Sequence, residues 1–136
     1  MWQGDPAIND YVQGWVAPRV KEQYGIDLVT VPSQGNDIVA KLMVEAEAGA
    51  RVSDYDMLWI NGETFFQLRQ IDALFGPFTS RLPNARYIDF ENPFIAYDFQ
   101  QPLEGFECPW GNVQLTLIHD SERVPDPPRT PEALAE

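Results

Sequence analysis

The sequence has few of the residues on which catalysis and metal binding commonly depend. Its 136 residues include one cysteine, Cys108, and one histidine, His119. A single cysteine excludes an internal disulfide, and the two residues together exclude the common cysteine- and histidine-based zinc sites. Basic residues are also few, since nine lysines and arginines stand against twenty-one acidic residues, a formal charge of −12. This balance argues against a nucleic-acid or anionic-membrane partner, because both require a basic surface.

Long hydrophobic runs and nucleophile or phosphate-binding motifs are missing as well. No apolar run is long enough to predict a membrane-spanning helix, and residues 1–6 do not have the pattern of a signal peptide. The GxSxG, P-loop and GxGxxG motifs are absent. His119 beside Asp120 is more typical of a surface or capping residue than of a catalytic one. We therefore expect no catalytic residue, no metal and no cofactor.

Hydrophobic residues make up 44% of the chain, and as far as residue 75 they follow helical and strand-like patterns. Asp5 and Pro6 favour a helix start, so we expect a helix over 6–24 that is kinked or weakened at Pro18 and ends at Gly25. Further helices are expected over 37–49 and 63–74. Apolar runs predict strands over 26–31, 55–60 and 113–118, the last two buried on both faces.

The alternation of helices and strands predicts an α/β fold with a parallel sheet. We divide the chain into βα units over 1–75, an irregular connection over 76–112 with one short strand near Ile95, a last strand and turn over 113–124, and a linker with a helix start over 125–136. The first helix has no strand before it, which suggests a fragment truncated at both ends. Its unpaired strands would then self-associate, or 26–31 and 55–60 would pair directly.

Three turns carry candidate ligand-binding residues. These are Gly4 and Asp5 in the first turn, Ser33, Gly35 and Asn36 in the second, and Asn61, Gly62 and Glu63 in the third. In a parallel sheet such turns lie at one edge, where helix N-termini and free amides converge on ligands. The same residue types are also ordinary turn and cap residues, so each turn alone favours a structural role. Only the three turns in succession make ligand binding an equal alternative.

Two tryptophans in glycine-containing loops, Trp2 and Trp110, suggest an aromatic platform for a ligand, whereas Trp15 and Trp59 are expected in the core. We predict that Trp2 and Trp110 are partly exposed and flank one shallow groove with Asn61 and Glu63. Acidic neighbours would suit a cationic or polar organic ligand.

The alternative is a carboxylate-dependent α/β enzyme such as a glycoside hydrolase. It would use Glu63 with Asp98 or Glu104.

Several segments together resemble the extracellular solute-binding proteins of bacterial ABC importers, most closely an uncharacterised, thiamine-type branch. The segments are Gly4-Asp5-Pro6-Ala7-Ile8-Asn9, Trp59-Ile60-Asn61-Gly62-Glu63, Leu74-Phe75-Gly76-Pro77, Pro109-Trp110-Gly111 and Asp120-Ser121-Glu122-Arg123-Val124-Pro125. The resemblance covers nearly the whole chain.

This resemblance implies a type II periplasmic binding protein, in which two α/β lobes close on a solute, with this chain forming part of the N-terminal, three-layer lobe. It implies capture of a small solute without chemistry, delivery to the transmembrane subunits of an ABC permease, and a periplasmic or extracellular location. The ligand-facing positions that it implies are the turns around Gly4 and Asp5, around Ser33 to Asn36 and around Asn61 to Glu63, together with Trp110 and Gly111.

Overall fold

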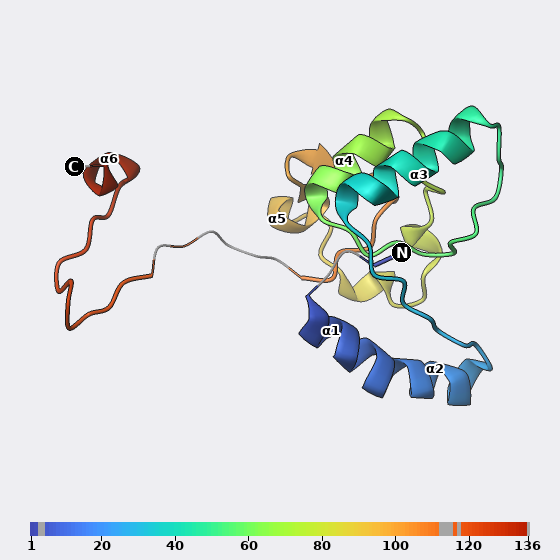
Figure 1. Cartoon of the computed structure of the whole chain (residues 1–136), viewed down its shortest axis with the longest axis horizontal. Helices are drawn as coiled ribbons and strands as arrows, with labels where there is room; N and C mark the ends of the chain where they lie inside the picture. The colour runs from blue at the N-terminus through green and yellow to red at the C-terminus, as the bar shows by residue number, and fades with distance from the viewer. Residues whose placement is uncertain (3–4, 112–115, 117, 136) are drawn as a thin grey trace.

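The computed structural model describes residues 1–2, 5–111, 116 and 118–135, and this part of the chain is mainly helical (Figure 1). The helices are α1 (Pro6–Tyr11), α2 (Ala17–Tyr24), α3 (Gly35–Glu47), α4 (Gly62–Gln70), α5 (Pro93–Ala96) and α6 (Pro131–Leu134). Single turns of other helix types occupy Val12–Val16, Thr79–Arg81 and Ala85–Tyr87. Strands β1 (Tyr97–Asp98) and β2 (Gln101–Pro102) form an antiparallel hairpin, the only sheet among the described residues.

The expected parallel three-layer α/β sheet is therefore wrong. Neither 26–31 nor 55–60 forms a strand. Trp2 makes one isolated bridge to Pro32, just after the first segment, and a second to Trp59, near the end of the second segment. The physical reason is a lack of pairing partners, since residues 1–2 supply only two residues of backbone between the two segments. Residues 26–31 are mainly exposed, with Val29 75% accessible. Residues 55–60 are mostly half-buried, and Leu58 and Ile60 pack against the core between α3 and α4. The strand expected over 113–118 lies largely outside the described residues.

The first expected helix forms, with a defect in its middle. The Asp5 carboxylate accepts a hydrogen bond from the Ala7 amide at 2.7 Å, and α2 ends at Gly25 with a φ of 70°. Between α1 and α2 the backbone widens into a π-helical turn over Val12–Val16. Pro18 has no amide hydrogen to donate to the preceding turn, which explains why the regular ladder is interrupted there.

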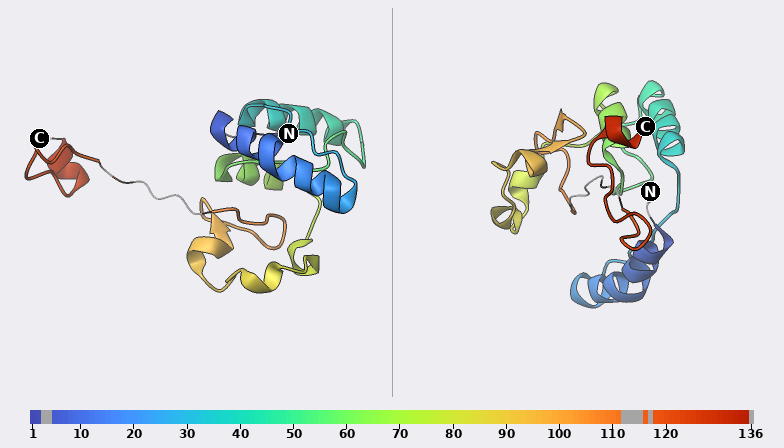
Figure 2. Two further views of the ribbon diagram at one scale, coloured as in Figure 1. Left: turned by 90° about the horizontal axis from the view of Figure 1, so that it is seen from below. Right: turned by 90° about the vertical axis from the view of Figure 1, so that its left-hand side faces the viewer.

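Helices α3 and α4 lie side by side and provide the core (Figures 1 and 2). Ile38 and Leu42 on α3 are four residues apart and face Leu68 on α4, and all three are buried. Phe65 on α4 is buried as well. Both helices confirm the amphipathic patterns read from the sequence, although α4 ends at Gln70, four residues before the expected end.

The expected irregular connection over 76–112 contains short elements rather than one strand near Ile95, which itself lies in α5. The antiparallel hairpin follows at once, with Tyr97 opposite Pro102. Farther along, the expected turn after Asp120 forms, and the Thr130 hydroxyl caps α6 by accepting from the Ala133 amide at 3.2 Å. Helix α6 lies apart from the other helices (Figures 1 and 2).

The molecule exposes much more surface than a compact protein of its mass. Its accessible area is 10812 Å², whereas a compact monomer of this size exposes about 7,200 Å². Large apolar side chains contribute to the excess, including Val52, Phe75 and Phe99 at 78–86% accessibility. The buried core is correspondingly small and is concentrated between α3 and α4.

Candidate functional site

Segments that are distant in the sequence meet around Trp2. It makes one parallel bridge to Pro32 and a second to Trp59. Its amide donates to the Val31 carbonyl, and its carbonyl accepts from the Ser33 amide, both at 2.9 Å. The backbone of Trp2 therefore joins the segment that precedes α3 to the segment that precedes α4.

The parallel direction of these segments brings three helix starts to one side of the molecule. Helices α3 and α4 each begin three residues after the residue that bridges to Trp2, at Gly35 and Gly62, and α1 begins four residues after Trp2, at Pro6. All three helices start at the same side in Figure 1. The starts of α1, α3 and α4 are thus neighbours, although no continuous sheet of described residues joins them.

Two of the three helix starts are capped by their own side chains. Asp5 caps α1, and the Asn61 side chain accepts from the Thr64 amide at 3.1 Å at the start of α4. Gln34, the N-cap of α3, makes no side-chain cap bond. Asp5 and Asn61 therefore have structural roles as caps whatever else they do.

The other residues proposed from the sequence differ widely in accessibility. Gly35 and Gly62 are buried, Ser33 is half-buried, and Asn36, Glu63 and Gly111 are exposed. Gly4 lies outside the described residues. The side chains available to a solute are therefore fewer than the sequence suggested.

Three tryptophans form one aromatic cluster at this side. The Trp2 and Trp59 rings are stacked, with centroids 4.4 Å apart, and Trp110 meets Trp59 edge-on at 4.8 Å. Trp2 is only 5% accessible, whereas Trp110 is 69% accessible. Trp2 and Trp110 thus belong to one cluster, but the predicted groove with a partly exposed Trp2 is wrong because Trp59 stacks on Trp2. Trp110 is the indole of the cluster that a solute can reach.

Trp15 does not belong to the core, contrary to expectation. It is 48% accessible, its ring stacks with Tyr11, and the Arg19 guanidinium lies 3.8 Å from its centroid. A cation over an indole is favourable even at the surface, which explains how an exposed tryptophan is accommodated on this helix.

Two acidic side chains of the 76–112 segment, Asp98 and Glu107, interact with each other. Asp98 on β1 packs so closely on Gly62 that an added Cβ there would contact its carboxylate. Glu107 interacts electrostatically with Asp98, and one of its carboxylate oxygens, Oε2, is buried without a hydrogen-bond partner among the described residues. Gly62 is three residues from Trp59, and Glu107 is three residues from Trp110. Each of these separations spans at most about 11 Å.

Burial controls the protonation of this pair. It raises the pKa of Glu107 to about 7, with the negative charge of Asp98 as the second cause. Burial also raises the pKa of Asp98, against an opposing hydrogen bond from the Phe99 backbone. Burial and the charge of Glu107 raise the pKa of the Cys108 thiol, so this cysteine is a poor nucleophile at neutral pH.

The carboxylate pairs proposed from the sequence are not the pair that the fold assembles. Glu104 forms an ion pair with Arg69 at 2.6 Å, and Glu63 is exposed in the first turn of α4. Asp98 was identified from the sequence, whereas Glu107 was missed. Its position three residues before Trp110, within the irregular 76–112 segment, was the only available signal.

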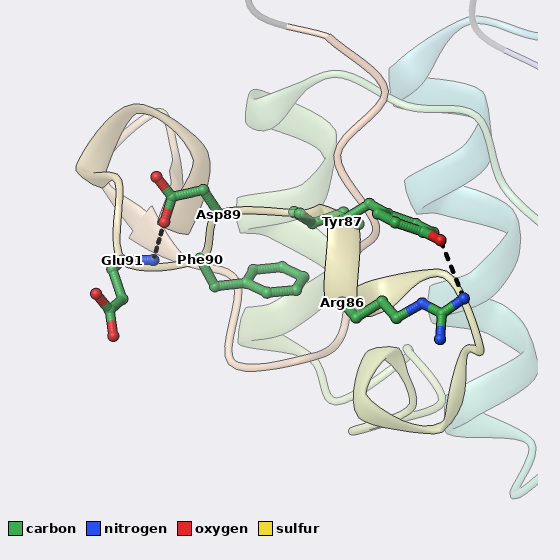
Figure 3. Close-up of a pocket in the computed structure, with 6 residues that line it drawn as sticks. Arg86, Tyr87, Asp89, Phe90 and Glu91 are labelled. Atoms are coloured by element: carbon green, nitrogen blue, oxygen red, sulfur yellow. Dashed lines mark hydrogen bonds between the residues drawn. The ribbon is translucent and has the colours of Figure 1, made fainter.

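Two shallow hollows lie at the surface of the described residues, and Trp110 lines the second of them. The first has a volume of about 480 Å³ and is lined by residues 86–91 (Figure 3). In it the Arg86 guanidinium donates to the Tyr87 hydroxyl at 3.0 Å, and the Asp89 carboxylate accepts from the Glu91 amide at 3.2 Å. The second hollow has a volume of about 310 Å³, and Trp110 is one of its walls together with Tyr87, Asp89, Phe94 and Pro109.

The described part of the chain contains neither a helix able to cross a membrane nor a group of three or more histidine, cysteine or acidic side chains placed to hold a metal ion.

Comparison with known proteins finds a similar sequence within a longer protein. Protein YnjB of Escherichia coli strain K12 is 41% identical to this chain over 137 residues. The alignment covers 99% of this chain, and the chain spans only 35% of the length of YnjB. No family model matches the chain, and no solved structure matches it.

Proposed function

We propose that the chain contributes the tryptophan side of a binding site for a small cationic organic solute. The observation that carries this proposal is the exposed Trp110 indole, held edge-on by Trp59 within three residues of the partly buried Glu107. An indole face attracts a cation through its quadrupole. Because the pKa of Glu107 is raised to about 7, its carboxylate form supplies the opposite charge only as the pH rises through neutrality. The formal charge of −12 favours the approach of cations to the whole molecule.

We further propose that binding serves transport rather than chemistry, with the protein acting as the substrate-binding component of an ABC importer in the periplasm or outside the cell. The support is the sequence resemblance set out above, together with three helix starts that meet beside the aromatic cluster. Because the chain spans 35% of YnjB, the full site of a longer protein would include residues beyond this chain. Delivery to permease subunits is part of the same proposal.

A carboxylate-dependent enzyme is the second candidate, and one observation favours it. Glu107 and Asp98 interact, and the pKa of Glu107 is raised to about 7. A protonated carboxyl beside an ionised one is the arrangement used for general acid and base catalysis. This candidate replaces the pairs expected from the sequence, Glu63 with Asp98 or Glu104.

A thermal-shift screen of the whole chain tests the proposal. The screen contains organic cations, neutral sugars and organic anions, and we expect the cations to raise the melting temperature. Trp110→Leu should remove this effect, whereas Trp15→Leu, a matched change of an exposed tryptophan outside the cluster, should retain it. Stabilisation by no solute, or equal stabilisation of both variants, would contradict the proposal.

A parallel hydrolase screen with chromogenic glycosides tests the second candidate. Turnover that is lost in Glu107→Gln would establish the enzyme and displace the transport proposal. The absence of turnover in a chain that binds cations would leave binding as the function.

A further inference from the structure

The second hollow is bounded by aromatic rings from three separate segments. Tyr87, Phe94 and Trp110 all line it, and their side chains are 74%, 73% and 69% accessible. Its volume of about 310 Å³ is at the lower end of the range for small-molecule sites. Exposed aromatic rings are costly to leave in water, and three around one hollow offer a ligand several π faces at once.

Local structure fixes the backbone that carries each ring. Tyr87 closes a 3₁₀ turn, and its amide donates to the Asn84 carbonyl at 3.0 Å. Phe94 lies in the first turn of α5, where its amide donates to the Asn92 side chain at 3.0 Å. Trp110 is in edge contact with Trp59. A backbone that is already held in place lowers the conformational entropy lost when a ligand orders these side chains.

The charge of the hollow favours a cation. Among the described residues that line it, Asp89 carries the only carboxylate and none is basic. Just outside, the Arg86 guanidinium lies 4.9 Å from the centroid of the Tyr87 ring. This guanidinium shows that the Tyr87 ring can face a cation, and its own positive charge opposes the cation that the hollow would take.

We infer that this hollow binds a quaternary ammonium group, with Tyr87, Phe94 and Trp110 as an aromatic cage and Asp89 as the acidic residue at its wall. A quaternary ammonium carries its charge on methyl and methylene groups and cannot donate ordinary N–H hydrogen bonds, so aromatic faces are its natural partners. The inference rests on the proposed function and names the chemical group of the solute. Glu107, near Trp110 in the sequence, adds negative charge only where it is ionised, as the pH rises through about 7.

Calorimetric titration of the whole chain with choline tests the inference, with 3,3-dimethylbutanol as the probe of equal shape and no charge. We expect choline to bind at least about 5-fold more tightly than the alcohol, a ratio set by cation–π attraction and by Asp89. Phe94→Leu should weaken choline binding about 2–5-fold. Phe75→Leu is the matched control, because Phe75 is 78% accessible and does not line the hollow.

Two charge variants complete the test. Asp89→Asn should weaken choline binding and leave the alcohol unaffected, whereas Asp10→Asn, the same charge change on α1, should alter neither. Equal binding of choline and the alcohol, or equal effects of Phe94→Leu and Phe75→Leu, would overturn the cage.

Failure of the cage and failure of the proposed function give different results. If choline does not bind but another organic cation stabilises the chain in a Trp110-dependent way, the cage is wrong and the proposed function stands. If no cation stabilises the chain, both are wrong.

Discussion

The protonation of Glu107 should make the stability of this protein fall as the pH rises toward neutrality. Its pKa is raised from 4.5 to about 7 in the folded chain, first by burial and second by the charge of Asp98. A carboxyl whose pKa is higher in the folded state binds its proton more tightly there. It therefore stabilises the fold at low pH, and this contribution is lost between about pH 4.5 and pH 7.

The size of the stability loss follows from the difference between the ordinary pKa of Glu107 and its raised pKa in the folded chain. At about 1.4 kcal/mol per pH unit, complete exclusion of water would give about 3 kcal/mol. Glu107 is only half-buried, and screening by water reduces the expected loss to about 1–2 kcal/mol. Glu107→Gln removes the titrating group, so its unfolding free energy should change less over the same pH range.

Urea unfolding followed by circular dichroism at several pH values between about 4.5 and 8 measures this difference. Glu22→Gln is the control, because it makes the same chemical change at an exposed position on α2, and it should keep the pH dependence of the wild type. Parallel pH profiles for the wild type and Glu107→Gln would refute the argument that burial near Asp98 controls this carboxyl.

Three further predictions concern packing and assembly. Leu68→Ala, at a fully buried position between α3 and α4, should lower the unfolding free energy by about 2–5 kcal/mol in urea titrations. Leu58→Ala, at a half-buried position, should lower it by about 1 kcal/mol. Equal losses for the two variants would contradict the assigned core. Gly62→Ala should lower the melting temperature despite the better helix propensity of alanine, because the added methyl would lie 2.5 Å from Phe99 Cδ2; a higher melting temperature would show that the hairpin yields easily. The backbone of residues 26–30 pairs with no other described segment, so sedimentation equilibrium should detect self-association that grows with concentration; a monomer at every concentration would exclude it.

The sequence was sufficient for the helices because their signals are local. Asp5 with Pro6 at one end and Gly25 at the other marked the first helix, and the spacing of Ile38 and Leu42 marked α3. These features act within one or two turns of backbone, and the observed caps and buried faces agree with them. Pro18 likewise accounts for the irregular turn that precedes it.

The strands were wrong because a strand depends on residues far away in the sequence. The β-branched run over 26–31 has the composition of a strand. However, only Met1 and Trp2 lie between this run and the segment that contains Trp59. Without a longer neighbour its backbone groups remain unpaired, whatever its propensity. Secondary-structure patterns could not reveal how much backbone would be available for pairing.

The candidate site was predicted only in part for the same reason. The common edge of the turns and the membership of Trp2 and Trp110 in one cluster followed from chain direction. The stacking of Trp59 on Trp2, which buries Trp2, and the approach of Asp98 to Glu107 depend on tertiary contacts of the 76–112 segment. That segment has no periodic pattern from which its path could be inferred.

The most direct test of the proposed binding site is a choline titration followed through the indole N–H signals of the four tryptophans in a proton–nitrogen correlation spectrum. We predict that the Trp110 signal moves most and saturates, that Trp59 follows because its ring touches Trp110, and that Trp15, outside the cluster, does not move. A spectrum in which Trp110 stays fixed at saturating choline, or in which Trp15 moves as much as Trp110, would contradict a cation site at the tryptophan cluster.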